Sequence, residues 1–137
     1  MFKLAIPQQS KKGDIAFFRN GIRFSHEFIE RERLTLAKYV WVFLDEPYIG
    51  FLFLAEQKVN SLKLTDSGKN TSGKTVSAAF LKKHEWIEKV MLAKDISRRK
   101  FTAEKVNDRT EITALYIKYK VNLTENMPES DDYDIPF

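Results

Sequence analysis

The most constraining feature of this sequence is a pair of strongly apolar segments, Lys38 to Leu44 and Ile49 to Ala55, joined by the turn Asp45-Glu46-Pro47-Tyr48. Each segment has the length and the β-branched and aromatic content of a strand, and the residues between them favour a turn. The pair therefore predicts adjacent antiparallel strands. A chain of 137 residues around such a centre is expected to form one compact domain.

A second hairpin is predicted over residues 14 to 25, DIAFFRNGIRFS. Its two apolar segments meet at Asn20-Gly21. This pair favours a tight hairpin turn because asparagine and glycine readily adopt the positive φ that both central positions of such a turn require. Ser25 is placed to cap a short helix over HEFIERERL, with Phe28 and Ile29 on its buried side. A weaker strand is expected over Ser61 to Thr65, before the polar loop DSGKNTSGK.

The last predicted strands cover Lys100 to Val106 and Thr110 to Val121, connected by Asn107-Asp108-Arg109. In the second of them Leu115, Ile117, Tyr119 and Val121 alternate with Tyr116, Lys118 and Lys120. This period of two predicts a strand with one buried face and one polar face.

A weak internal repeat is visible at a spacing of 52 residues. Gly21-Ile-Arg-Phe-Ser-His-Glu-Phe-Ile-Glu-Arg31 matches Gly73-Lys-Thr-Val-Ser-Ala-Ala-Phe-Leu-Lys-Lys83 in its glycine, serine, aromatic and charged positions. Each copy leads into an apolar segment ending in aspartate, Tyr39 to Asp45 and Val90 to Asp95. We interpret this as a weak internal duplication of a strand–helix–strand unit. The expected fold class is α+β, with curved antiparallel sheets and two short helices.

The residue types exclude several classes of site. Because the chain has no cysteine, a disulfide framework, a thiolate nucleophile and a cysteine-ligated zinc site are excluded together. No apolar run reaches the length of a membrane span, and the N-terminus does not have the order of a signal peptide. We expect a cytoplasmic protein without a cofactor.

The charges divide the chain into a basic body and an acidic end. Residues 125 to 137 hold five acids and no base, which leaves residues 1 to 124 with 23 basic and 14 acidic side chains, a net charge of +9. Most of the excess lies between Lys58 and Lys105. The division predicts a domain over 1–124 that meets a polyanion and a disordered acidic tail over 125–137.

The string Gly68-Lys-Asn-Thr-Ser-Gly-Lys74-Thr75 satisfies the P-loop pattern GxxxxGK[ST], and Val42-Phe-Leu-Asp-Glu-Pro47 resembles a Walker B strand. A small ATPase using Lys74 and Asp45 is therefore one alternative. The order of the motifs opposes it, since P-loop enzymes place the phosphate loop first, between a strand and a crossover helix. The loop could still contact nucleic-acid phosphates through Lys69 and Lys74.

Mixtures of basic and aromatic residues predict a surface for single-stranded nucleic acid, which is held by cations on its phosphates and by rings stacked on its bases. In a strand, Tyr39, Trp41 and Phe43 share one face, as do Tyr116, Lys118 and Lys120. The candidate DNA-binding residues are Phe18, Arg19, Arg23, Tyr39, Trp41, Lys69, Lys74, Arg98, Arg99, Lys100, Phe101, Tyr116, Lys118 and Lys120. These features do not distinguish DNA from RNA.

The chain ends in Asp131-Asp132-Tyr133-Asp134-Ile135-Pro136-Phe137. This end resembles the acidic C-terminal tip of bacterial and bacteriophage single-stranded DNA-binding proteins, which finish Asp-Asp-Asp-Ile-Pro-Phe; Tyr133 departs from that pattern. The resemblance implies that the terminal phenylalanine and its carboxylate enter a pocket on replication and repair enzymes, with the acids facing a basic rim. The partner-binding residues it implies are Asp131, Asp132, Asp134, Ile135, Pro136 and Phe137.

The body lacks the opening signature of the usual bacterial family. It looks more like the whirly or PC4-like fold, whose members usually assemble as oligomers. An OB-fold barrel is the alternative. We therefore expect a non-enzymatic protein of phage or bacterial origin that acts in the cytoplasm of a bacterial host cell. It would coat single-stranded DNA without strong sequence preference in replication, recombination or repair, form a homo-oligomer, and recruit partner enzymes through its tip. A second alternative is a phage adaptor that uses the tip to inhibit or redirect a host replication enzyme.

Overall fold

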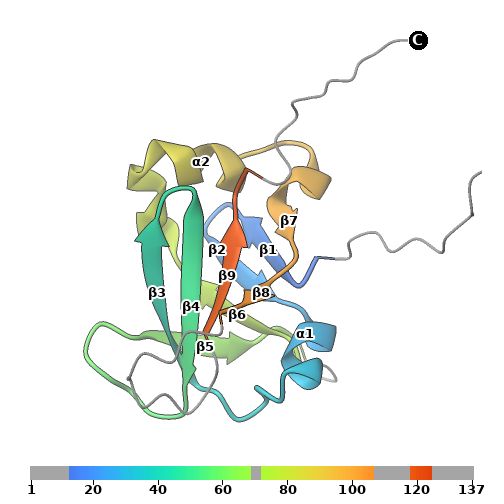
Figure 1. Cartoon of the computed structure of the whole chain (residues 1–137), viewed down its shortest axis with the longest axis vertical. Coiled ribbons are helices and arrows are strands. Elements are labelled where there is room, and N and C mark those ends of the chain that lie inside the picture. The colour runs from blue at the N-terminus through green and yellow to red at the C-terminus, as the bar shows by residue number, and fades with distance from the viewer. Residues whose placement is uncertain (1–12, 69–71, 107–117, 125–137) are drawn as a thin grey trace, which may run out of the picture.

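The computed structural model describes residues 13–68, 72–106 and 118–124, and these form an α+β domain (Figure 1). Its antiparallel strands make a curled, half-barrel sheet in the order β7-β1-β2-β6-β5-β3-β4-β9-β8. The strands are β1 (Ile15–Phe18), β2 (Gly21–Phe24), β3 (Tyr39–Asp45), β4 (Tyr48–Leu54), β5 (Leu62–Asp66), β6 (Lys74–Ser77), β7 (Lys100–Phe101), β8 (Glu104–Lys105) and β9 (Lys118–Asn122). The expected fold class is confirmed at this level.

The curl of the sheet has two structural causes. Strand β5 pairs with β3 through Leu62 and Lys63 but with β6 from Leu64 onward, so it turns the corner between two halves of the sheet. The edge strands β7 and β8 are separated in the chain only by residues 102 and 103. This short connection brings the two ends of the sheet toward each other, on the right of Figure 1.

The hydrophobic core fills the inside of the curl. Phe24 makes edge-to-face contacts with Phe51 and Phe53, at centroid distances of 5.2 and 5.0 Å, and Phe28 contacts Tyr119 in the same way at 5.1 Å. Each such ring adds roughly 2 to 3 kcal/mol of burial energy, and edge-to-face pairs add more. The α-helices α1 (His26–Arg31) and α2 (Glu85–Met91) cover the core, α2 across the upper end of the curl in Figure 1 and α1 at its lower right.

The predicted hairpin over residues 14–25 is confirmed as β1–β2, but the predicted turn is wrong. Phe18 pairs with Gly21, so the loop residues are Arg19 and Asn20. Among the described residues, only Gly13, Arg33 and Asn60 have positive φ, so Gly21 is not there for a left-handed turn. A Cβ on Gly21 would collide with the backbone oxygen of Val76 in β6 and with the Phe18 ring. Close packing of strands requires this glycine.

The local predictions around the first helix and the central hairpin are confirmed. The Ser25 hydroxyl accepts a 3.0 Å hydrogen bond from the Phe28 backbone N–H, and Phe28 and Ile29 are buried. The helix ends at Arg31, earlier than the apolar pattern suggested. Strands β3 and β4 pair along their whole length to Asp45 and Tyr48, and the weaker strand is present as β5.

The proposed duplication holds for only one strand and one helical turn. Residues Ala79–Lys83 form the 3₁₀-helix η1, which corresponds to α1, but no serine side chain caps it. The expected strand Val90 to Asp95 is wrong, because Val90 and Met91 belong to α2, which buries Ile87 beside them. The spacing of these three apolar residues is helical, and a buried helix face satisfies it better than a strand would.

The strand predicted over Lys100 to Val106 is interrupted. Residues Ile96–Arg99 form the 3₁₀-helix η2, and the segment after it is divided between β7 and β8. In β9, Tyr119 and Val121 are buried as predicted, with Lys118 and Lys120 on the other face. The segment 107–117, which includes Tyr116, lies outside the described residues.

Candidate nucleic-acid interface

One face of the sheet half formed by β5, β3, β4 and β9 collects aromatic and basic side chains; we call it the outer face. Alternation along β3 directs Val40 into the core and places Tyr39, Trp41 and Phe43 on the outer face. The strand register then sets the rows Lys63–Tyr39–Leu54, Trp41–Leu52–Lys118, Phe43–Gly50–Lys120 and Asp45–Tyr48–Asn122. The outer face is therefore a ladder of rings flanked by lysines.

Two aromatic side chains of the outer face, Trp41 and Phe43, are held by specific contacts. The Trp41 indole N–H donates a 2.8 Å hydrogen bond to the backbone oxygen of Val59, in the loop between β4 and β5. Its ring lies edge-to-face against Phe43, at a centroid distance of 6.4 Å. Trp41 is half-buried and Phe43 is 46% exposed. Because both rings are held before any ligand arrives, they could stack on bases at a small entropic cost.

Positive charge accompanies these rings. Lys118 and Lys120 are partly exposed on β9, and Lys63 is exposed on β5 opposite Tyr39. The Lys120 ammonium lies 4.5 Å from the centroid of the Tyr48 ring, a cation–π contact that holds the long side chain over the sheet. Two acids lie at the margin of the same face, Asp45 at the end of β3 and Glu104 opposite Lys120. The balance of the face is basic.

A hollow of about 340 Å³ opens on the outer face between β3, β4 and β9. It is lined by Phe43, Asp45, Tyr48, Gly50, Phe51, Val106, Lys118, Tyr119 and Lys120. Gly50 lies between Phe43 and Lys120 in the register, so the floor of the hollow carries no side chain at this point. The site therefore combines ring edges, ammonium groups and one carboxylate around an open volume.

The structure brings together four of the residues predicted from sequence, Tyr39, Trp41, Lys118 and Lys120. Phe43 was expected on the same face but was not among the candidates. Tyr48, Gly50 and Lys63 were missed. Tyr48 was assigned to the turn, whereas the structure pairs it with Asp45 at the end of the hairpin. The positions of Gly50 and Lys63 depend on the register.

Other predicted residues lie in the second half of the sheet, several strands away. Phe18 is 36% exposed on β1, Arg19 is in the β1–β2 turn, and Arg23 is exposed on β2. Lys100 is on β7, where it pairs with Ala16. Arg98 and Arg99 lie in η2, and the Arg98 guanidinium is 3.9 Å from the Asp95 carboxylate. These residues do not form one surface with Trp41.

The prediction that Phe101 stacks on bases is wrong. Its side chain is 1% exposed and contacts Phe17 edge-to-face at a centroid distance of 5.5 Å. In the two-residue strand β7, Lys100 is partly exposed and its neighbour Phe101 faces the core. Alternation therefore allows only one of these two residues to reach a ligand.

The prediction that Lys74 contacts phosphate is also wrong for this structure. Lys74 is 7% exposed, and its ammonium lies 3.4 Å from the Asp66 carboxylate. Lys74 and Thr75 are the first residues of β6, which pairs antiparallel with β5. A P-loop leads from a strand into a helix, and the described part of this loop leads from a strand into a strand.

Several candidate residues lie outside the described part of the chain. They are Lys69, Tyr116 and the tip residues Asp131, Asp132, Asp134, Ile135, Pro136 and Phe137. Their assigned roles stay predictions.

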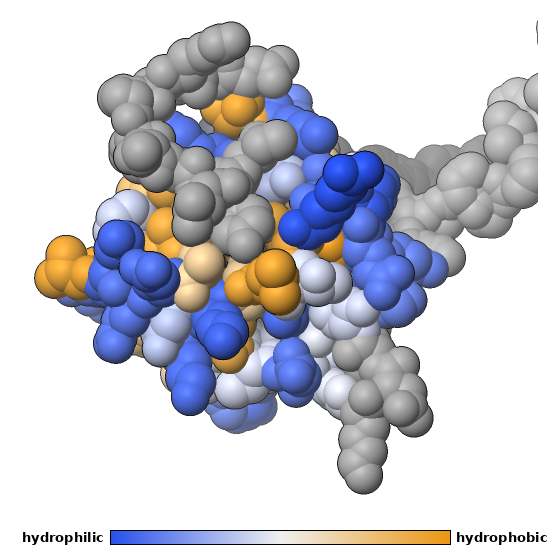
Figure 2. Space-filling view, turned by 90° about the horizontal axis from the view of Figure 1, so that it is seen from below, coloured by the Kyte–Doolittle hydropathy of each residue, from blue (hydrophilic) through white to orange (hydrophobic). Residues whose placement is uncertain are grey.

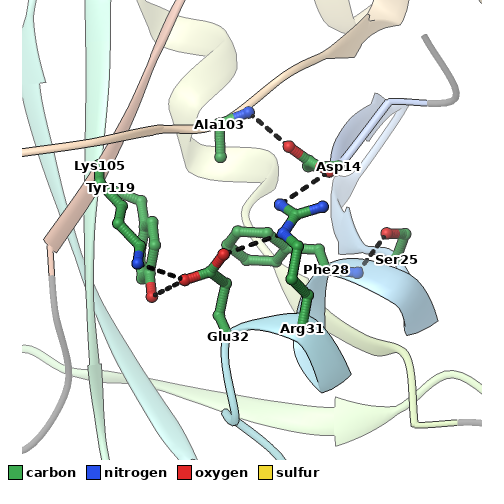
Figure 3. Close-up of polar contacts among 8 residues, drawn as sticks. All are labelled: Asp14, Ser25, Phe28, Arg31, Glu32, Ala103, Lys105 and Tyr119. Atoms are coloured by element: carbon green, nitrogen blue, oxygen red, sulfur yellow. Dashed lines mark hydrogen bonds and ion pairs between the residues drawn. The ribbon is translucent and has the colours of Figure 1, made fainter. Parts of the chain in front are cut away.

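A polar network beneath the outer face fixes β9 against α1 (Figure 3). The Glu32 carboxylate accepts hydrogen bonds from the Tyr119 hydroxyl at 3.0 Å and from the Arg31 guanidinium at 2.9 Å, and the Lys105 ammonium is 3.2 Å away. Arg31 also pairs with Asp14 at 3.2 Å. Because Tyr119 lies between Lys118 and Lys120, this network holds the strand that carries both lysines.

The network changes the titration of its members. Burial alone would raise the pKa of Glu32, but the hydrogen bonds from Arg31, Lys105 and Tyr119 outweigh it and hold the pKa below its usual value. Burial, reinforced by the hydrogen bond to Glu32, raises the pKa of Tyr119 well above its usual value. Glu32 is therefore ionised and Tyr119 neutral at physiological pH.

Figure 2 shows the molecule from below. On this face the hydrophobic side chains form small patches that hydrophilic side chains separate.

Within residues 13–68, 72–106 and 118–124, no cluster of three histidine or acidic side chains could hold a metal ion. No helix in these segments is both long and apolar enough to cross a membrane.

Comparisons with protein-family models, with curated proteins and with solved structures found no match.

Proposed function

We propose that this protein binds single-stranded DNA on its outer face, without strong sequence preference, and acts in replication, recombination or repair. The observation that carries the proposal is that paired strands bring the contacting rings of Trp41 and Phe43 and the residues Lys118 and Lys120 to one face of the sheet. Rings and lysines that are only partly buried on one sheet face match the stacking and phosphate contacts of a single strand.

The mechanism follows from the geometry of the face. Phosphates would contact Lys63, Lys118 and Lys120, and each contact would release counterions and make the affinity depend on salt. Bases would stack on Tyr39, Trp41 and Phe43, at roughly 1 to 3 kcal/mol for each stacked base. A duplex hides its bases inside the helix, so it would keep only the phosphate contacts and bind more weakly.

The C-terminal tip supplies the second part of the proposal. Asp134-Ile135-Pro136-Phe137 resembles the partner-binding tip of bacterial and phage single-stranded DNA-binding proteins, and we infer that it recruits replication or repair enzymes. We also infer a whirly or PC4-like arrangement in a homo-oligomer. The curled antiparallel sheet and the two short helices of the described residues are compatible with such an arrangement.

The proposal is tested by measuring the binding of a labelled single strand of mixed sequence by fluorescence anisotropy, in a salt series. We expect the protein to bind the single strand more tightly than the matched duplex. The Lys118→Gln and Lys120→Gln variants should bind the single strand more weakly, and their affinity should depend less steeply on salt. Lys94→Gln is the matched control, since Lys94 is exposed beyond α2 and away from the outer face.

Three outcomes would overturn the proposal in different ways. No binding of single strand or duplex by the folded protein would leave the tip as the functional element and favour the adaptor. If Lys94→Gln and Lys118→Gln lost the same affinity for the single strand, the outer face would not be the binding site. Tighter binding of a matched RNA strand would change the ligand from DNA to RNA.

A further inference from the structure

The hollow on the outer face has the chemistry of a site for a single base. Phe43 and Tyr48 form two of its walls, Lys118 and Lys120 line the β9 side, and Asp45 supplies a carboxylate. The Lys120 ammonium is held over Tyr48, which places a positive charge at the edge of the open volume. An aromatic wall, cations and one hydrogen-bond acceptor are the groups that would recognise a base together with its phosphate.

Gly50 is the residue that leaves this volume open. A Cβ at this position would lie 3.6 Å from the Tyr119 backbone oxygen and 3.7 Å from the Phe43 Cβ, both ordinary contacts. Gly50 also does not have positive φ. Neither backbone conformation nor close packing therefore requires glycine in the middle of β4, in contrast to Gly21. What the missing side chain provides is space between Phe43 and Lys120.

We propose that this hollow receives one unstacked nucleobase that carries an exocyclic amino group, as cytosine, adenine and guanine do. The inference rests on the proposed binding of single-stranded nucleic acid and adds a preferred base to it. The base would lie over Gly50 against the Phe43 ring, and Lys118 and Lys120 would contact the phosphates on either side. The Asp45 carboxylate would accept a hydrogen bond from the amino group, which thymine lacks.

The first test fills the hollow without changing charge or removing a ring. In Gly50→Val the added side chain would occupy the floor, and we expect the affinity for a single strand of mixed sequence to fall about tenfold, the loss of one stacked base. Ser77→Val is the matched control, because it adds the same side chain at an exposed position of β6. Thermal unfolding of each variant verifies that the sheet is intact.

The results separate this inference from the proposed function. If the wild-type protein binds the single strand and Gly50→Val binds it equally well, the hollow is not a base site, although the outer face still binds DNA. If the wild-type protein binds no single strand, the proposed function fails and this inference fails with it. Weaker binding by Gly50→Val alone supports the inference.

The second test examines the preferred base. We expect the wild-type protein to bind oligo-dC about fivefold more tightly than oligo-dT, and Asp45→Asn to bring the ratio close to one, because an amide can pair with either base. Equal affinities in the wild-type protein would overturn the assignment of an amino-bearing base. Removing a negative charge should strengthen binding of both strands, so the ratio is the quantity that tests Asp45.

A third measurement needs no variant. Titration of the ¹⁵N-labelled wild-type protein with deoxycytidine monophosphate should shift the backbone amide signals of Gly50, Phe43 and Lys120 at millimolar nucleotide. Two results would contradict a base site in this hollow. One is a set of signal shifts confined to other residues of the sheet, and the other is the absence of any shift in a protein that binds the oligonucleotide.

Discussion

Replacement of Glu32 by glutamine should destabilise the fold by removing the charge at the centre of the network that connects α1, β8 and β9. The Glu32 side chain is only 10% exposed, and its carboxylate accepts from Tyr119, Arg31 and Lys105. The glutamine keeps the shape of the side chain but not its charge. It also presents an N–H₂ group where one carboxylate oxygen accepted hydrogen bonds.

The expected size of the effect follows from the exposure of each partner. The Tyr119 hydroxyl is buried, and a hydrogen bond of this kind to a charged group contributes about 1.5 to 3 kcal/mol. Arg31 and Lys105 are about half exposed, so each adds only about 0.5 kcal/mol after screening by solvent. Because glutamine keeps one oxygen that accepts hydrogen bonds, only part of these contributions is lost. We expect a loss of about 2 kcal/mol in the free energy of unfolding and a fall in Tm of roughly 6 to 10 °C.

Urea unfolding at pH 7, followed by circular dichroism, measures this loss. Glu27→Gln is the matched control, because Glu27 is exposed in the first turn of the same helix. A double-mutant cycle with Tyr119→Phe should give a coupling energy of about 1 kcal/mol. A loss below about 0.5 kcal/mol, or no coupling to Tyr119, would show that the network does not stabilise β9 and would refute the reasoning.

The same substitution has a defined pH dependence. Because the pKa of Glu32 is lowered in the folded protein, its contribution is present above the unfolded value of about 4.3 and is lost as the pH falls through the folded value. The difference in stability between the wild-type protein and Glu32→Gln should therefore be constant near neutral pH and shrink below about pH 4. A difference that grew on acidification would contradict the assigned direction.

Three further predictions concern stability. Ser25→Ala removes the hydroxyl that caps α1 and should cost about 1 kcal/mol in urea unfolding, whereas Ser25→Thr should cost much less. Gly21→Ala forces a Cβ against the backbone of Val76 and should cost about 2 kcal/mol, and a neutral result would contradict the close approach of β2 and β6. Because the pKa of Tyr119 is raised, its contribution is complete below about pH 10 and is lost at higher pH; thermal melts should show a steeper alkaline loss for the wild-type protein than for Tyr119→Phe.

The sequence predicted those elements whose signals are local. The serine cap of α1, the β3–β4 hairpin and the alternation in β9 each depend on a few neighbouring residues, and each was confirmed. Gly21 was misread because its reason lies in β6, more than fifty residues away. The strand expected from Val90 followed the apparent repeat, although the helical spacing of Ile87, Val90 and Met91 was the stronger physical signal.

The candidate site was predicted in part for the same reason. Alternation placed Tyr39 and Trp41 on one face of a strand and Lys118 and Lys120 on one face of another. Only the pairing of β4 with both strands shows that the two faces are continuous. The depth of burial of Phe101 and Lys74 depends on tertiary packing, which the basic and aromatic pattern does not reveal. The hollow over Gly50 depends on the same packing.

The central claim is that single-stranded DNA lies on the outer face, and Trp41 is the reporter that tests it most directly. In a Trp86→Phe variant Trp41 is the only tryptophan of the chain. Titration with a single strand of mixed sequence should quench its fluorescence, with a slope of about −2 in log affinity against log salt if three lysines contact phosphates. Binding detected by anisotropy without any change in Trp41 fluorescence would contradict the claim.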